Sequence, residues 1–200
     1  MKVVGITGTS GSGKSTVCGW LTQWGYTVLD GDAISRELAV PGSRYLKELV
    51  AAFGPEICDG NGVLLRRELG QKVFADPAAH RRLTEITMPL ILDELRRRLR
   101  QAQARGERCV FLDGALIIDT PYAQLCSIIV AVIGDREQQI RRIMQRDGIS
   151  RDAAQDRLNR QARSDFLRQR ADFVLENTGT LDQLRQQTEQ LLERIKGIDP

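Results

Sequence analysis

Histidine, closely spaced cysteine pairs and aromatic side chains are scarce in this chain. Aromatic residues account for 5% of its 200 positions, it has one histidine, His80, and its four cysteines show no C-x-x-C pair. The ligands of a structural zinc site are missing, so we expect reduced, partly buried thiols. No apolar run approaches the roughly 18 residues of a membrane span, and the first residues lead into a strand-like stretch rather than a signal peptide. We expect a cytoplasmic protein with no membrane partner.

An excess of charge of one sign is also lacking. The 29 Lys and Arg residues against 26 Asp and Glu residues give a net charge of +3, too mild to indicate nucleic-acid binding. The basic cluster Arg96–Arg100 is more typical of a solvated helix end than of a binding patch. We therefore expect no nucleic-acid partner.

Strands and helices alternate along the predicted secondary structure. Hydrophobic residues at 42% are enough for a packed core, and 200 residues correspond to one domain. Strands are predicted at 2–7, 26–29, 108–113, 127–133 and 173–175. The near-continuous apolar runs are typical of strands covered on both faces. The expected fold class is α/β, with three layers and about five parallel strands.

Two of the predicted helical stretches have unusual features. A long helix is expected from Asp76-Pro77 to about Arg105, with a kink at Pro89. The stretch from Ser150 to about Gln169 is predicted as one arginine-rich helical segment with few apolar anchors, so we expect it to be mobile.

Residues Gly8 to Ser15 read GTSGSGKS and fit the pattern G-x-x-x-x-G-K-[ST] in full. They lie between the first predicted strand and a predicted helix, the context in which this pattern indicates a phosphate-binding P-loop. Gly11 and Gly13 allow the backbone to turn its N–H groups around a β-phosphate, at the positive end of the helix dipole. Lys14 would neutralise β- and γ-oxygens, and Ser15 would offer its hydroxyl to Mg²⁺.

Two aspartates, Asp30 and Asp32, follow the second predicted strand. Ligands of open parallel sheets bind at the carboxyl ends of strands, so we expect these carboxylates in the same crevice as the P-loop. There a carboxylate can orient an acceptor hydroxyl and take its proton, or hold a magnesium-bound water. The alternative is that one or both cap the helix that begins near Ala33.

Other charged residues have two interpretations each. Arg142 and Arg146 are four residues apart on a predicted helix and could direct two guanidinium groups at one anion, or they could pair with Asp147 or Glu137 on the surface. Asp113 ends a predicted strand, where it resembles a magnesium-binding carboxylate of the Walker B type or serves as a helix cap.

A series of motifs, in the family's order and over nearly the whole chain, resembles the dephospho-coenzyme A kinase family. They are Gly8 to Thr16, Asp30-Gly31-Asp32 with Arg36, Gly62-x-Leu64-x-Arg66 leading to Val73-Phe74-x-x-Pro77, Pro89-Leu-Ile, and Gln145-Arg146-Asp147 followed by Asn177-x-Gly179. The resemblance implies a nucleoside-monophosphate-kinase-like P-loop fold. It also implies that ATP, with Mg²⁺, phosphorylates the ribose 3′-hydroxyl of dephospho-coenzyme A, the last step of coenzyme A synthesis.

The resemblance further implies an internal division and a set of site residues. The core would cover about 1–32, 107–140 and 171–200, a helical acceptor-binding region about 33–106, and a lid about 141–170, in a monomer or weak homo-oligomer. Lys14 and Arg142 would act in catalysis with Asp32 as the base, and Asp32, Arg36 and Leu116 would contact the acceptor. ATP would be bound by Gly11, Ser12, Gly13, Lys14, Ser15, Thr16, Arg146, Asn177 and Gly179, the last two bordering the adenine.

Two departures from the family pattern affect the acceptor. Met88-Pro89 stands where the family usually has His-Pro, and Ala115-Leu-Ile-Ile-Asp119 stands where it has Pro-Leu-Leu-Phe-Glu. One alternative function is therefore a kinase for another small alcohol, such as a nucleoside, a nucleotide or a shikimate-like metabolite. The other is a non-catalytic nucleotide-dependent regulator, for which a guanine-reading N-K-x-D is expected and Asn177-Thr-Gly179 is found instead.

Overall fold

The chain divides into two compact units. The computed structural model describes residues 1–115, 117–118 and 120–198. One unit consists of Met1–Leu29 together with the chain from Gln101 onward, and the other of Asp30–Arg100. The strands are β1 (Lys2–Thr7), β2 (Thr27–Asp30), β3 (Cys109–Asp113), β4 (Ile128–Gly134) and β5 (Phe173–Asn177).

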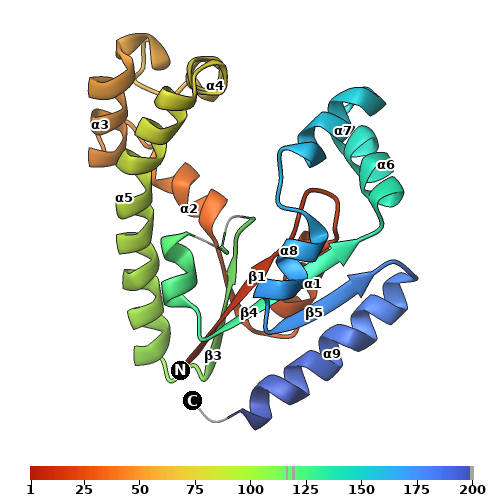
Figure 1. Ribbon diagram of the computed structural model, residues 1–200. Coiled ribbons are helices and arrows are strands. Elements are labelled where there is room, and N and C mark those ends of the chain that lie inside the picture. Colours follow the sequence, from red (N-terminus) through yellow and green to blue (C-terminus); the bar gives the residue numbers. More distant parts are fainter. Residues whose placement is uncertain (116, 119, 199–200) are drawn as a thin grey trace. The chain divides into compact units, whose positions relative to one another are not determined.

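All five strands belong to one sheet, in the order β2-β3-β1-β4-β5 (Figure 1). β1 pairs in parallel with β3 and β4, and β4 pairs in parallel with β5. Since β1 lies at the centre, the loop that leaves its carboxyl end has strands on both sides. The arrangement confirms the predicted α/β class with its parallel sheet.

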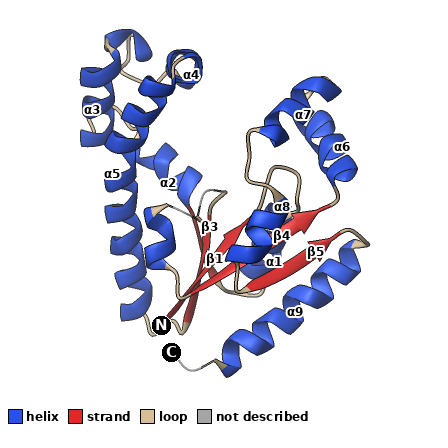
Figure 2. Cartoon of the chain, viewed as in Figure 1, coloured by secondary structure: helices blue, strands red, loops and turns tan. Residues whose placement is uncertain are grey.

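Helices connect these strands, as Figure 2 shows. In chain order they are α1 (Lys14–Gln23), α2 (Gly31–Leu38), α3 (Arg44–Phe53), α4 (Arg66–Ala75), α5 (Pro77–Ala104), α6 (Arg136–Asp147), α7 (Arg151–Asn159), α8 (Ser164–Arg170) and α9 (Leu181–Gly197), with the 3-10 helices η1 (Pro55–Ile57) and η2 (Pro121–Leu125). The predicted long helix is confirmed as α5, which continues through Pro89 without ending there.

The side chains of β4 alternate between two apolar clusters, one on each face of the sheet. Val132 belongs to the larger cluster, which includes Leu184 of α9 and residues of α1. The next residue, Ile133, belongs with Leu167 of α8 to the other. Because neighbouring side chains of a strand point to opposite faces, helices cover both sides of this strand, which explains its apolar run.

The segment predicted as a single mobile helix over 150–169 is two helices, α7 and α8, each anchored by apolar side chains. Ala154 and Leu158 of α7 are buried against Ile143 of α6, and Leu167 of α8 is buried on the sheet. The prediction of one helical segment was wrong, because these few apolar residues are spaced for two separate contacts, which a polar composition does not show. The mobility of the segment stays a prediction.

The second unit is helical, and a tyrosine joins its first two helices. The hydroxyls of Tyr45 on α3 and Ser35 on α2 are 2.8 Å apart, and burial raises the pKa of the Tyr45 phenol. Beyond α3, the amide of Leu65 donates to the carbonyl of Ile57 at 2.7 Å, which closes the turn before α4. These contacts give the unit its own hydrogen-bonded framework.

The four cysteines are free thiols, as expected. Burial raises the pKa of Cys109 to about 11 and that of Cys126 to about 12, so both remain protonated at neutral pH. Neither has the lowered pKa of a nucleophilic cysteine, and we assign them to packing.

Candidate active site

The P-loop between β1 and α1 packs so closely on its neighbours that two of its glycines have no room for a side chain. Gly11 has φ 72°, and a Cβ there would lie 2.9 Å from the carbonyl oxygen of Gln139. Gly13 has φ 102°, and a Cβ there would lie 2.3 Å from Nδ2 of Asn177. Backbone conformation and space together require glycine at both positions.

The loop and the first turn of α1 present a set of unpaired amide groups. Within the described part of the chain, the N–H groups of Gly11, Gly13, Lys14 and Ser15 donate to no backbone acceptor. The first turn of α1 carries no acidic residue. Free N–H groups and the positive end of a helix dipole favour an anion, and a phosphate is the anion that this loop geometry fits.

Lys14 forms an ion pair with Asp113, the last residue of β3. The pairing register explains it, since Asp113 lies opposite Ile6 at the carboxyl end of β1. Both side chains are mostly buried, with exposed fractions of 18% and 12%. The helix-cap interpretation of Asp113 is wrong, because the next helix after β3 among the described residues is η2, whose N-cap is Thr120. A cation and a carboxylate therefore lie together beside the P-loop.

The two arginines of α6 have different partners. Arg142 donates from Nη1 to the carbonyl oxygen of Gly11 at 2.9 Å, which places its guanidinium on the P-loop. Arg146 forms two hydrogen bonds with the Asp147 carboxylate, at 2.7 and 2.9 Å, which lower the pKa of Asp147 to about 2. The structure thus brings Arg142 to the loop and gives Arg146 the surface pair that was the alternative interpretation.

Asn177 lies beneath the P-loop. Its side-chain amide donates to the carbonyl oxygen of Ser12 at 2.7 Å, and the residue is 2% exposed. The side chain of Asn177 thus contacts the loop, and the role of the Asn177–Gly179 segment beside the adenine stays a prediction. Ser12 Oγ and Asn177 Oδ1 are buried without a hydrogen-bond partner among the described residues. Gly179 is exposed and precedes Thr180, the N-cap of α9.

Two glutamines that sequence reasoning missed contact the start of the loop. Gln139 on α6 donates to Thr9 Oγ1 at 2.6 Å and to the carbonyl of Ser10 at 3.1 Å. Gln161, after α7, accepts from the Ser10 amide at 2.9 Å and donates to its hydroxyl at 3.0 Å. These hydrogen bonds join residues 129 to 151 positions apart, and no local pattern in the sequence marks either glutamine.

The residues near Lys14 fit a magnesium ion that takes most of its ligands from the substrate. No group of three or more His, Cys, Asp or Glu side chains in the described chain could form a metal cage. Ser15 is exposed at the first turn of α1, and the Asp113 carboxylate lies beside Lys14. A hydroxyl and a carboxylate are oxygen ligands of the kind that Mg²⁺ prefers alongside phosphates and water.

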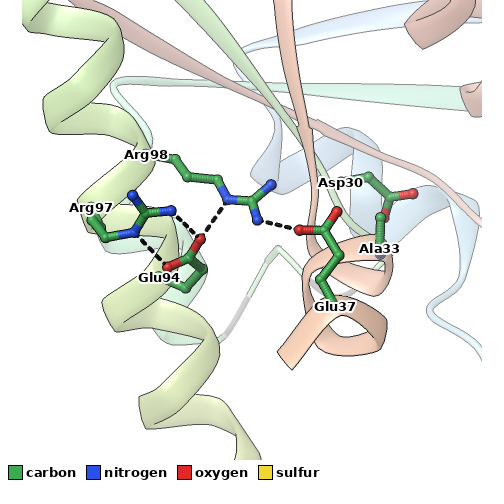
Figure 3. A network of polar contacts seen from close by, with 6 residues as sticks. All are labelled: Asp30, Ala33, Glu37, Glu94, Arg97 and Arg98. Carbon is green, nitrogen blue, oxygen red and sulfur yellow. Dashed lines mark hydrogen bonds and ion pairs between the residues drawn. The ribbon is translucent and has the colours of Figure 1, made fainter. Parts of the chain in front are cut away.

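In the second unit, the aspartates at the end of β2 and in the first turn of α2 have separate roles. Asp30 is the N-cap of α2, accepting from the amides of Asp32 at 2.8 Å and Ala33 at 3.1 Å (Figure 3 shows Asp30 and Ala33). Arg36 lies 3.7 Å from the same carboxylate. Asp32 is exposed, and its side chain has no hydrogen bond or ion pair within the described residues. The cap interpretation is therefore correct for Asp30, and Asp32 keeps a free carboxylate.

A network of ion pairs joins α2 to α5 (Figure 3). Glu37 of α2 contacts Arg98, which donates to Glu94 at 2.7 Å. Glu94 also accepts two hydrogen bonds from Arg97, and these contacts lower its pKa to about 2. Arg97 and Arg98 of the arginine cluster are thus paired with carboxylates, and Arg98 links α5 to the helix that carries Asp32.

Of the remaining residues that the sequence analysis named, the structure describes Thr16 and Met88. The amide of Thr16 donates to the carbonyl of Gly13 at 3.0 Å, within the first turn of α1. Leu116 and Asp119 lie outside the described residues, and Met88 is half-buried on α5.

In the described chain, no helix is long and apolar enough to span a bilayer.

Comparison with known proteins identifies the family. The model of the dephospho-CoA kinase family matches residues 2–183. The dephospho-CoA kinase of Anaeromyxobacter dehalogenans is 37% identical over 197 residues, which cover 98% of this chain and 93% of the relative.

Solved structures agree with the family model. A Thermus thermophilus protein aligns with a TM-score of 0.80 at 36% identity, over 96% of this chain and 97% of its own. The dephospho-CoA kinase of Campylobacter jejuni aligns with a TM-score of 0.73 at 25% identity, over 98% and 99%. Together with the complete P-loop, these matches show that the chain belongs to the dephospho-CoA kinase family.

Proposed function

We propose that this protein transfers the γ-phosphoryl group of ATP to the ribose 3′-hydroxyl of dephospho-coenzyme A, giving coenzyme A and ADP. The observation that carries the proposal is the P-loop itself, with its unpaired amides, Lys14 and Arg142, in a chain of this family. The family model and the Anaeromyxobacter dehalogenans relative both carry the dephospho-CoA kinase name, which favours this acceptor over other alcohols and over a non-catalytic regulator.

Nucleotide binding is proposed for the P-loop and its charged neighbours. The unpaired amides of Gly11, Gly13, Lys14 and Ser15 would hold the β-phosphate. Lys14 would exchange Asp113 for β- and γ-oxygens, which carry more negative charge. Arg142 already lies on the loop and would stabilise charge on the transferred group. Arg146 would contribute only after leaving Asp147, so we assign it a weaker role.

Ser15 and Asp113 would hold the Mg²⁺ that accompanies ATP. The ion supplies neutralisation of negative charge on the phosphate oxygens when it is bound. Asp113 would then have a second use, because a carboxylate released by Lys14 is available to the cation or to its bound water. This assignment makes the Lys14–Asp113 pair a preformed part of the site.

Asp32 is proposed as the base for the acceptor. Its carboxylate would accept the proton of the 3′-hydroxyl as the new oxygen–phosphorus bond forms and the bond to the β-phosphate oxygen breaks. The Asp32 carboxylate is free for this role, whereas the carboxylate of neighbouring Asp30 is occupied by its helix-cap contacts. Arg36 on the same helix is proposed to face the acceptor, with Leu116.

A coupled ADP-release assay with a panel of alcohols tests the proposal. Dephospho-coenzyme A, adenosine and shikimate are each offered with ATP and Mg²⁺, and the position of the new phosphate is read by mass spectrometry and ³¹P NMR. We expect release with dephospho-coenzyme A and a phosphate on its 3′-oxygen. Release with another acceptor alone would contradict the proposal.

The residue limits of a lid, a cytoplasmic location and a monomeric or weakly oligomeric state remain predictions.

A further inference from the structure

Gln161 connects the segment between α7 and α8 to the P-loop. Its Oε1 accepts from the Ser10 amide at 2.9 Å, and its Nε2 donates to Ser10 Oγ at 3.0 Å. The oxygen and the nitrogen of the Gln161 side-chain amide thus both bind Ser10, which is 151 positions away in the chain. The Ser10 amide is occupied in this way and the Ser12 amide donates to the Thr9 carbonyl, so the amides left for phosphate are those of Gly11, Gly13, Lys14 and Ser15.

Gln139 of α6 binds the same part of the P-loop, residues Thr9 and Ser10. Its side chain reaches the Thr9 hydroxyl and the Ser10 carbonyl, and the residue is 4% exposed. The amide, carbonyl and hydroxyl of Ser10 are therefore all bound by glutamine side chains. Gln139 belongs to the packed interior, whereas Gln161 is half-buried at the edge of an open cavity of about 340 Å³ that Arg136 and Arg163 also line.

We propose that Gln161 is a positioning residue for phosphoryl transfer, acting through Ser10 on the phosphate-binding part of the P-loop. This inference rests on the proposed function. The loop works by holding its amides in fixed positions, and a misplacement of about 1 Å can cost about 10²-fold in rate. A side chain that ties the loop to the α7–α8 connection supplies such rigidity without touching the substrate.

The test compares Gln161→Ala with Ser10→Ala, the double variant, and Gln169→Ala as a control. Gln169 is an exposed glutamine on α8 with no hydrogen bond among the described residues. We expect Gln161→Ala to lower kcat by roughly tenfold or more, with the KM for ATP within a few fold of wild type. Ser10→Ala loses only the hydroxyl contact, so its effect should be smaller and should add nothing to Gln161→Ala.

Hydrogen exchange of the Ser10 amide gives a readout that needs no turnover. The Ser10 amide should be protected from exchange in the wild type and in Gln169→Ala, and should lose that protection in Gln161→Ala. Thermal unfolding reports whether each variant folds. Wild-type kcat in Gln161→Ala, or a lowered kcat with unchanged Ser10 protection, would overturn the proposal. Failure of the wild type to use dephospho-coenzyme A would instead contradict the proposed function, and the exchange measurement would still test the Gln161 contact.

Discussion

Lys14 pairs with Asp113 and would exchange that partner for a phosphate during catalysis. Lys14→Ala removes a cation that stabilises charge in the transition state, so we expect kcat to fall on the order of 10²-fold or more. Lys196→Ala is the control, because this exposed lysine of α9 forms a surface ion pair with Glu193 at 2.7 Å. Steady-state ADP release measures both variants, and unchanged turnover in Lys14→Ala would rule out the assigned role.

Two glycines of the same region should respond in opposite directions to alanine. Gly13→Ala places a Cβ against Asn177 in a strained backbone conformation, which should cost about 1–3 kcal/mol of unfolding free energy and impair nucleotide binding. Gly19 lies inside α1, where an added Cβ would have no atom within 4 Å, so Gly19→Ala should stabilise the protein by about 0.5–1 kcal/mol. Urea unfolding distinguishes the two, and equal destabilisation would contradict this account.

Local motifs were predictable from the sequence, and partners across the fold were not. The P-loop depends on neighbouring residues, so its position and the start of α1 at Lys14 were predicted well. The use of Asp30 as a cap was one of two open interpretations, since either aspartate fits a helix start. The burial of Asn177 beneath Ser12 depends on packing between distant strands and loops, which no spacing in the sequence shows.

At the scale of elements, the network between α2 and α5 should make stability depend on pH. The Arg97 and Arg98 contacts lower the pKa of Glu94 from 4.5 to about 2. A lowered folded-state pKa contributes stability above the unfolded value, and that contribution is lost as the pH falls through the folded value. We therefore expect the difference in unfolding free energy between wild type and Glu94→Gln to be constant above about pH 5 and to shrink toward about pH 2.

Denaturant unfolding at a series of pH values measures that difference. Glu193→Gln is a suitable control, because its ion pair with Lys196 is exposed on both sides and surface pairs contribute little. A difference for Glu94→Gln that does not change between about pH 6 and pH 3 would show that the network does not stabilise the folded state.

The types of elements were predictable where the apolar pattern was long and regular. The β4 run follows such a pattern and appears where expected. The 150–169 stretch has only scattered apolar residues, among them Leu158 and Leu167, and these anchor two helices on different surfaces. Which surface each side chain meets is a property of the folded chain, so the break between α7 and α8 was not predicted.

At the scale of the whole molecule, the proposed reaction uses residues of both units. Lys14 and Arg142 belong to the first unit, and Asp32 belongs to the second. The strand order, with β1 central, explains why the P-loop has structural neighbours on every side. The function itself depends on whether the free carboxylate of the second unit acts on the alcohol that receives the phosphoryl group.

The turnover of Asp32→Asn with dephospho-coenzyme A, compared with Asp30→Asn, tests that claim most directly. Asparagine caps a helix as well as aspartate does, so Asp30→Asn should retain a rate within a few fold of wild type. Asp32→Asn cannot accept the proton, and we predict a loss of roughly 10²- to 10⁴-fold in kcat with intact nucleotide binding. A near wild-type rate for Asp32→Asn would contradict the account.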